Sequence, residues 1–226
     1  MTELTDLKAL AFDYYGTIAD KGALAATVDE KFPAKGPAFT KLWFAQTQRY
    51  CFQNGMMERY MTWDALTKAA FAFAAAEMGM DVDDATRDDW IAADQWLPVH
   101  AEAPAALERL AGKFSLHVLS MASPWMIEQS QQNAGVTEHF SGLISAEPEG
   151  LYKPGRAAYQ LGVDRIGLPG EAIGFVSGNS FDVIGAKNFG YPSIWVRRTG
   201  QPLDELGPEP DLVVGDLMAM ADALGA

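Results

Sequence analysis

The first apolar segment of the chain is Leu7-Lys8-Ala9-Leu10-Ala11-Phe12, and it runs directly into Asp13-Tyr14-Tyr15-Gly16-Thr17. A short apolar run that passes into a turn with glycine is typical of a buried strand. The carboxylate of Asp13 therefore stands at the carboxyl end of the first predicted strand. The segments that follow decide which kind of sheet this strand joins.

Strand and helix patterns alternate after Pro98. Short apolar runs predict strands, and segments with three- and four-residue periodicity predict the helices between them. This alternation predicts an α/β fold, a doubly wound parallel sheet with helices on both faces. The predicted strands cover residues 114–119, 143–144, 172–176, 193–196 and 212–214, and the predicted helices cover residues 105–111, 124–133, 156–162, 181–189 and 217–224.

A block of different character separates the first strand from these units. Between about Asp20 and Trp96 the chain is rich in alanine, methionine and large aromatic residues at helical spacing. Breaks near Pro33, Asn54-Gly55 and Gly79 divide this block into four predicted helices. We therefore predict a core domain of residues 1–19 and 98–226, interrupted by an inserted helical cap domain of residues 20–97.

Composition and charge exclude several classes of protein. The 226 residues are 49% hydrophobic and 21% charged, which is typical of a folded globular chain. With 17 basic and 30 acidic residues the net charge is −13, so nucleic acid and anionic membranes are poor partners. No uncharged apolar run reaches the roughly 18 residues that a membrane span needs. The single cysteine, Cys51, and a first segment unlike a signal peptide favour a cytoplasmic location.

Polar side chains stand at or just beyond the ends of the predicted strands. In an open parallel sheet these ends meet at one edge, where ligands bind. We therefore expect Asp13, Ser120, Lys153 and the group from Ser177 to Asp182 to converge. Such a set suits covalent catalysis, in which one aspartate attacks, the lysine keeps it ionised and a second aspartate activates water.

Each of these residues also has a purely structural interpretation. An aspartate at a strand end is most often a turn residue or a helix cap, and a lysine is usually solvated. Ser177-Gly178-Asn179-Ser180 is compatible with a simple turn and N-cap, and Asp182 with a favourable interaction with a helix dipole. Only their joint position at successive strand ends favours a functional site.

Metal and dinucleotide sites are not indicated. His100, His117 and His139 are scattered and lack the spacing of metal ligands. The glycines between positions 174 and 190 do not form a dinucleotide-binding fingerprint. We therefore expect neither a cofactor nor a metal.

Four motifs, in order along the chain, resemble those of the haloacid dehalogenase (HAD) superfamily, and specifically of its L-2-haloacid dehalogenases (type II). The resemblance covers nearly the whole chain, and it implies a HAD-like, Rossmannoid core and a homodimer. The motifs are residues 11–20 around Asp13, Leu119-Ser120 followed by Ser123-Pro124, Tyr152-Lys153-Pro154 through Tyr159, and residues 175–182 continuing to Gly185-Ala186.

The resemblance implies hydrolytic dehalogenation of a small halogenated carboxylic acid. Asp13 would displace the halide from C2 with inversion, and Asp182 would activate the water that hydrolyses the aspartyl ester to a 2-hydroxy acid. Ser120 would hold the substrate carboxylate. The other implied catalytic residues are Lys153, which neutralises charge near Asp13, and Thr17, Ser177 and Asn179, which hold the carboxylates by hydrogen bonds. The other implied substrate-binding positions are Tyr15, Phe44, Trp63, Met121, Tyr159 and Phe181.

Two positions separate the chain from the phosphatases of the same superfamily. Those enzymes carry a second aspartate two residues after the nucleophile, where this chain has Tyr15, and an acidic residue at the position of Gly178. Fewer carboxylates weaken a site for a hard cation, so we expect metal-independent attack on carbon. The alternatives are a HAD-type hydrolase or phosphatase with a different substrate, and a catalytically weak binding homologue.

Two further positions depart from the dehalogenase pattern itself. The pattern has an arginine that receives the leaving halide where this chain has Phe44, and an asparagine where it has Met121. The loss of one preorganised donor typically costs on the order of 3 kcal/mol in the transition state. Lys41 and Gln48 lie within roughly 60° of Phe44 around the predicted helix, so either is a candidate replacement, whereas Arg49 is expected to point elsewhere.

Overall fold

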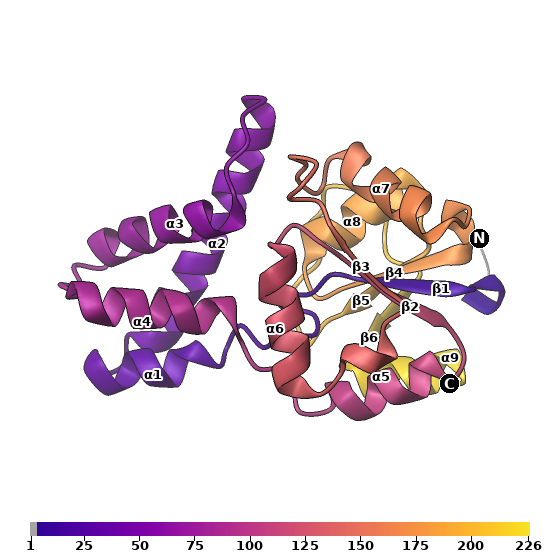
Figure 1. The fold of residues 1–226 in the computed structure, drawn as a ribbon, viewed down its shortest axis with the longest axis horizontal. Helices are drawn as coiled ribbons and strands as arrows, with labels where there is room; N and C mark the ends of the chain where they lie inside the picture. Colours follow the sequence, from indigo (N-terminus) through magenta and orange to yellow (C-terminus); the bar gives the residue numbers. More distant parts are fainter. Residues whose placement is uncertain (1–3) are drawn as a thin grey trace.

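The computed structural model describes residues 4–226, and its centre is a six-stranded parallel sheet (Figure 1). The strand order is β3-β2-β1-β4-β5-β6, with every neighbouring pair parallel. The predicted α/β fold is confirmed. The strands are β1 (Ala9–Phe12), β2 (Ser115–Ser120), β3 (Gly142–Ser145), β4 (Ile173–Ser177), β5 (Ser193–Val196) and β6 (Leu212–Val214).

Helices cover both faces of the sheet because the central strands are apolar on both sides. In β1, Ala9 and Ala11 pack into one cluster of buried side chains, whereas Leu10 and Phe12 pack into another. The first cluster lies under α7 (Arg156–Ile166) and α8 (Ser180–Phe189). The helices on the opposite face are α5 (Ala103–Ala111), α6 (Pro124–Ala134) and α9 (Leu217–Leu224) (Figure 1).

The strand order reverses beside β1, because the chain continues to β2 on one side of it and β4 lies on the other. Ligands bind at the carboxyl ends of the strands at such a point. The turn that follows β1 passes through Gly16, whose φ of +87° lies in a region that glycine adopts without steric cost. The chain therefore turns away from the sheet directly after β1, at the point where such folds bind ligands.

Helices α1 to α4 lie beside the sheet and form a unit of their own (Figure 1). We call α1 to α4 the helical unit. The four predicted helices are confirmed, and α2 ends at Met56, next to the predicted break near Asn54-Gly55. The helices are α1 (Leu24–Lys31), α2 (Gly36–Met56), α3 (Trp63–Glu77) and α4 (Asp84–Gln95).

Aromatic side chains form the interior of the helical unit. Trp43 of α2 makes an edge contact with Phe71 of α3, with ring centroids 5.1 Å apart. Its indole nitrogen donates a hydrogen bond of 2.9 Å to the carbonyl oxygen of Thr67, which satisfies a buried polar group. Phe39 and Trp90 complete the cluster. These four aromatic residues therefore serve as core, whereas Phe73 and Trp96 of the same block are exposed.

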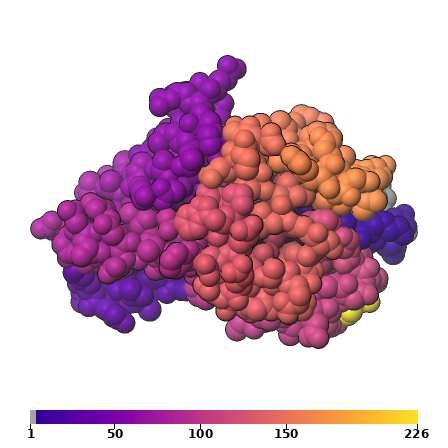
Figure 2. Space-filling model, in the orientation of Figure 1, coloured from indigo at the N-terminus to yellow at the C-terminus, as the bar shows by residue number. Residues whose placement is uncertain are grey.

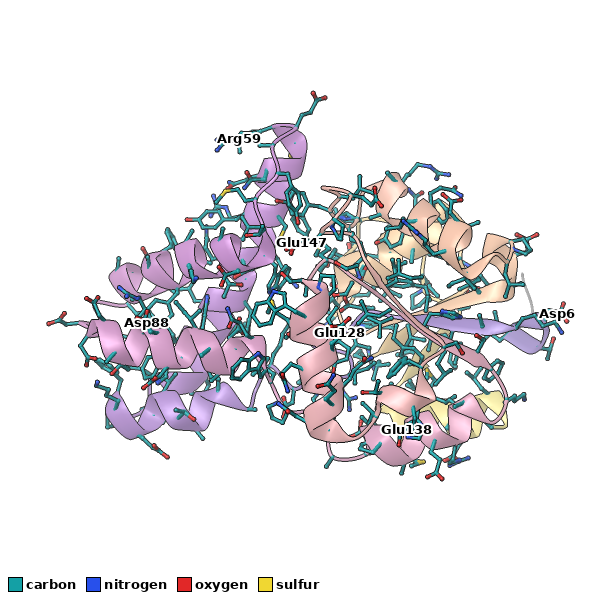
Figure 3. The ribbon with its side chains drawn as sticks, in the orientation of Figure 1. Asp6, Arg59, Asp88, Glu128, Glu138 and Glu147 are labelled. Carbon is teal, nitrogen blue, oxygen red and sulfur yellow. The ribbon has the colours of Figure 1, made fainter. Side chains whose placement is uncertain are left out.

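The helical unit meets the rest of the molecule along a continuous seam in the space-filling view of Figure 2, where the end of α2 projects from the surface. Glu147, in the loop after β3, lies at this seam (Figure 3), and its carboxylate accepts a hydrogen bond of 3.0 Å from the backbone nitrogen of Trp63. The Tyr15 hydroxyl donates to the carbonyl oxygen of Gln95 at 2.7 Å. No helix within residues 4–226 is long and apolar enough to cross a membrane.

Candidate active site

Asp13 follows β1 directly and is buried at the carboxyl end of the sheet. Its backbone nitrogen donates to the carbonyl oxygen of Val176 at 2.9 Å, which extends the pairing of β1 with β4. The side chain is 9% exposed. The carboxylate is therefore held on the sheet and has only a narrow opening to its surroundings.

Lys153 joins Asp13 to Asp182. Its ammonium nitrogen lies 2.9 Å from Asp13 Oδ1, 2.6 Å from Asp182 Oδ2 and 3.1 Å from the carbonyl oxygen of Leu119. These three acceptors match the three protons of an ammonium group. Burial lowers the pKa of Lys153, but the two carboxylates outweigh burial and hold that pKa above its ordinary value.

Asp182 is fully buried in the first turn of α8. The Tyr159 hydroxyl donates to its Oδ1 atom at 2.7 Å. Burial raises the pKa of Asp182 to about 6; Lys153 and Tyr159 oppose this rise, and Asp13 adds to it. The carboxylate is thus poised to exchange a proton near neutral pH.

The second oxygen of Asp13 is held by two further donors. Asn179 Nδ2 lies 2.8 Å from Asp13 Oδ2, and Thr17 Oγ1 lies 3.2 Å from the same atom. Thr17 in turn accepts a hydrogen bond of 2.8 Å from the backbone nitrogen of Gly178. Both carboxylate oxygens of Asp13 are therefore fixed in direction, as an attacking group requires.

Ser177 does not have the contacts that we predicted. Its hydroxyl accepts a hydrogen bond of 3.1 Å from the backbone nitrogen of Asn179, and within residues 4–226 it makes no hydrogen bond to a carboxylate. The expectation that Ser177 holds the carboxylates directly is wrong. The short side chain instead orders the turn that presents Asn179.

A small cavity of about 10 Å³ lies beside Asp13, between the sheet and the helical unit. Seven of the predicted site residues line it, together with Gln48, which was one candidate for the halide position, and Lys21, which was not predicted. Its walls are Asp13, Tyr15, Lys21, Gln48, Trp63, Ser120, Met121, Asn179 and Phe181.

The apolar part of the cavity comes from both sides of the seam. Trp63 of α3 stacks on Tyr15, with ring centroids 6.2 Å apart. Phe181 of α8 makes an edge contact with Phe52 of α2 at 5.0 Å. The Ser120 hydroxyl, at the end of β2, accepts a hydrogen bond of 3.2 Å from the backbone nitrogen of Ala122.

Two predicted pocket residues do not line the cavity. Tyr159 is fully buried behind Asp182, and Phe44 packs beside the cavity with Lys21 over its ring. Of the two candidates near Phe44, Lys41 is exposed to solvent and Gln48 lines the cavity, whereas Arg49 is exposed as expected. Whether such a residue reaches the cavity depends on the direction of its side chain, which the spacing of residues along a helix does not give by itself.

Lys21 is the main residue that the sequence did not indicate. It stands in the turn between β1 and α1, and a lysine in a turn is ordinarily solvated. No local pattern shows that its side chain folds inward. A hint lies in Gly16, because a side chain at that position would come within 3.1 Å of the Lys21 ammonium.

No group of three or more histidine, cysteine, aspartate or glutamate side chains is arranged to hold a metal within residues 4–226. The carboxylates of Asp13 and Asp182 instead share one ammonium. A buried aspartate fixed by a lysine at the end of the first strand of a parallel sheet is an arrangement for nucleophilic hydrolysis.

The chain belongs to the haloacid dehalogenase-like hydrolases. The model of this family matches residues 7–190, a span that includes Asp13, Lys153 and Asp182. The predicted membership of the superfamily is confirmed.

The chain is similar to several dehalogenases over nearly their full length. The chain is 35% identical to the (S)-2-haloacid dehalogenase of Pseudomonas sp. (strain YL) over 217 residues, which are 96% of this chain and 94% of that protein. It is 34% identical to haloacetate dehalogenase H-2 of Moraxella sp. (strain B) over 92% of this chain and 93% of that protein. The structure of L-2-haloacid dehalogenase from Xanthobacter autotrophicus with chloropropionic acid covalently bound has a TM-score of 0.88 and 27% identity, and the match covers 97% of this chain and 99% of that one. The resemblance stated from the motifs is confirmed.

Proposed function

We propose that this protein is a hydrolytic dehalogenase that acts on short 2-haloacids through an ester of Asp13. The observation that carries the proposal is the carboxylate of Asp13, which is fixed at both oxygens and faces a small cavity with both polar and aromatic walls. Relatives named as (S)-2-haloacid and haloacetate dehalogenases support the class of substrate.

In the first step, a carboxylate oxygen of Asp13 attacks C2 of the substrate from the side opposite the halogen. The new C–O bond forms as the carbon–halogen bond breaks, the halide leaves with the bonding electrons, and the configuration at C2 inverts. Ser120 and backbone N–H groups of the turn before α6 bind the substrate carboxylate. Lys153, Thr17 and Asn179 keep Asp13 ionised and oriented.

In the second step, water attacks the Cγ carbon of the Asp13 ester. Asp182 accepts a proton from this water, and the bond between Cγ and the substrate oxygen breaks. The departing alkoxide takes one proton and becomes the hydroxyl of a 2-hydroxy acid. The other proton leaves to solvent as Asp13 returns to its ionised form. The raised pKa of Asp182 suits a base of this kind.

This chemistry uses no metal. Lys153 supplies the positive charge between the two carboxylates. A carboxylate at position 178 would have no room, because a Cβ atom there would lie 2.1 Å from the carbonyl oxygen of Gly16. The geometry therefore favours attack on carbon over metal-assisted phosphoryl transfer.

The helical unit serves as the cap in this proposal. Trp63 of α3 and Gln48 of α2 supply part of the cavity wall. In this proposal the boundaries between cap and core lie near residues 20 and 97. A cap that excludes water leaves the Asp13 carboxylate poorly solvated, which favours its attack on the substrate. The homodimer and the cytoplasmic location stay predictions from the sequence.

The experiment that tests the proposal is a single turnover in heavy-oxygen water. Excess enzyme is mixed with 2-bromopropionate, released bromide is measured, and the peptide that contains Asp13 is analysed by mass spectrometry. We expect one labelled oxygen in Asp13 and none in the first product molecule, with Asp13→Asn as the control that yields neither label nor bromide. Label in the product with unlabelled Asp13, or release of phosphate from phosphate esters with magnesium but no halide release, would overturn the proposal.

A further inference from the structure

Lys21 folds over the turn after β1 and reaches the cavity beside Asp13. Its ammonium and last methylene groups pass over Gly16, so close that a Cβ atom at Gly16 would lie 3.1 Å from them. The side chain is partly buried and forms part of the cavity wall. The absence of a side chain at position 16 is what allows this course.

The Lys21 ammonium has no fixed partner. Within residues 4–226 it makes no hydrogen bond and no ion pair at contact distance, whereas the three protons of the Lys153 ammonium all have acceptors. Since an unpaired ammonium is costly to bury, its position next to a binding cavity requires an explanation. Lys21 is the one cation in the cavity wall that is free to bind a ligand.

Residues of the helical unit favour the positive charge of Lys21. Its nitrogen lies 5.5 Å from the ring centroid of Phe44 in α2, a distance typical of a cation–π contact. Asp94, near the end of α4, is buried, and its Oδ1 atom has no hydrogen-bond partner within residues 4–226. Burial raises the pKa of Asp94 to about 7, and Lys21 opposes this rise.

We propose that the Lys21 ammonium receives the halide as it leaves the substrate. The inference rests on the proposed dehalogenation. The electrons of the carbon–halogen bond pass to the halogen, and the resulting anion is held by the protons of Nζ without proton transfer. Phe44 supports Lys21 with its ring face, and Asp94 is a positioning residue that favours the charged form of the lysine.

The direction of the reaction favours the halide over the substrate carboxylate as the ligand of Lys21. In-line displacement sends the halogen away from Asp13, toward the wall that the helical unit provides. Lys21 contacts the helical unit at the ring of Phe44, beside the cavity, whereas Ser120 stands at the end of β2 in the sheet. Apolar neighbours such as Phe44 and Met121 lower the local polarity, which strengthens the attraction between an ammonium and a halide.

The first test is the dependence of the rate on the leaving group. Single-turnover rates of ester formation are measured with 2-chloro- and 2-bromopropionate for the wild type, Lys21→Met and Lys21→Arg, with Lys41→Met on the exposed side of α2 as the matched control. We expect Lys21→Met to lose on the order of a hundredfold in rate, with a larger loss for the chloro than for the bromo substrate. Lys21→Arg should retain most of the rate, and Lys41→Met should match the wild type.

The second readout is the pH profile. Burial lowers the pKa of Lys21 below its ordinary value, Asp13, Asp94 and Asp182 oppose this shift, and Lys153 adds to it. A required ammonium is lost as pH rises through its pKa, so the rate of ester formation should fall on the alkaline side below the usual lysine range of about 10.4. Lys21→Arg should move this limb upward, and Asp94→Asn should move it downward.

The third readout does not depend on turnover. Crystals soaked in bromide should show the ion beside Lys21 Nζ in the wild type and not in Lys21→Met. An equal rise in KM for both halogens with unchanged kcat would assign Lys21 to the substrate carboxylate and overturn the inference, as would bromide bound elsewhere. If the wild type releases no halide from any 2-haloacid, the proposed function fails. If it releases halide and Lys21→Met does so equally well, only the role of Lys21 fails.

Discussion

A Cβ atom on Gly178 would lie 2.1 Å from the carbonyl oxygen of Gly16, so the turn after β4 touches the turn after β1 at this point. The contact brings Asn179 within reach of Asp13 and leaves no space for any side chain at position 178. Gly178 is therefore required by the packing of the two turns. The absence of an acidic residue at this position follows from the close approach of the two turns beside Asp13.

We predict that Gly178→Ala separates these turns. Overpacking at a rigid backbone contact typically costs about 1–3 kcal/mol of stability, and the shift of Asn179 should lower the rate of ester formation at least tenfold. Urea unfolding and single-turnover kinetics measure the two effects. Gly215→Ala is the control, because nothing lies within 4 Å of its added methyl group. Equal stability and activity of the two variants would contradict the role assigned to Gly178.

We predict that Lys153→Met greatly lowers the free energy of unfolding. The variant leaves two buried carboxylates facing each other without a cation, and breaking a buried pair in this way typically costs about 3–5 kcal/mol. Lys187→Met is the matched control, since its ion pair with Asp211 lies nearer the surface and should cost only about 1 kcal/mol. Adding Asp182→Asn to Lys153→Met should restore part of the stability and none of the activity. Comparable unfolding free energies for the two lysine variants would rule out this account.

We predict that Tyr159→Phe shifts the acid side of the pH profile. Asp182 must be ionised to accept a proton from water, so ester hydrolysis should be lost as pH falls through about 6. The Tyr159 hydroxyl lowers the pKa of Asp182 by donating to it, so its removal raises that pKa and moves the loss to higher pH. Tyr191→Phe is the control, because the Tyr191 hydroxyl donates to a backbone oxygen instead. An unchanged acid limb in Tyr159→Phe would remove Asp182 from the base role.

The positions of the strands and helices could be predicted because hydrophobic periodicity is local. The last elements, β6 (Leu212–Val214) and α9 (Leu217–Leu224), have the predicted bounds. Helix α7 instead runs to Ile166, beyond the predicted end at Gly162. A Cβ atom at Gly162 would lie 2.5 Å from the Tyr191 hydroxyl, so this glycine permits close packing within a helix and does not end one.

The convergence of Asp13, Lys153 and Asp182 could also be predicted, because parallel strands end at one edge of the sheet. The direction of individual side chains could not be predicted from the sequence. Ser177 contacts a backbone nitrogen and not a carboxylate, and Lys21 turns inward from a loop. Both outcomes depend on contacts between distant segments, which leave no periodic pattern in the sequence.

Our last prediction concerns Phe44, where the dehalogenase pattern has an arginine. The Lys21 ammonium already lies over the Phe44 ring, so Phe44→Arg alone would place a second cation beside the first. We expect this variant to lose activity on 2-chloropropionate, because like charges in a poorly solvated site repel strongly. In the Lys21→Met background the same change should raise the rate, since the new guanidinium takes over the halide. The effects of the two substitutions should therefore be strongly non-additive in a double-mutant cycle of single-turnover rates. Additive effects, or a gain from Phe44→Arg while Lys21 is present, would show that the two positions do not serve one leaving group.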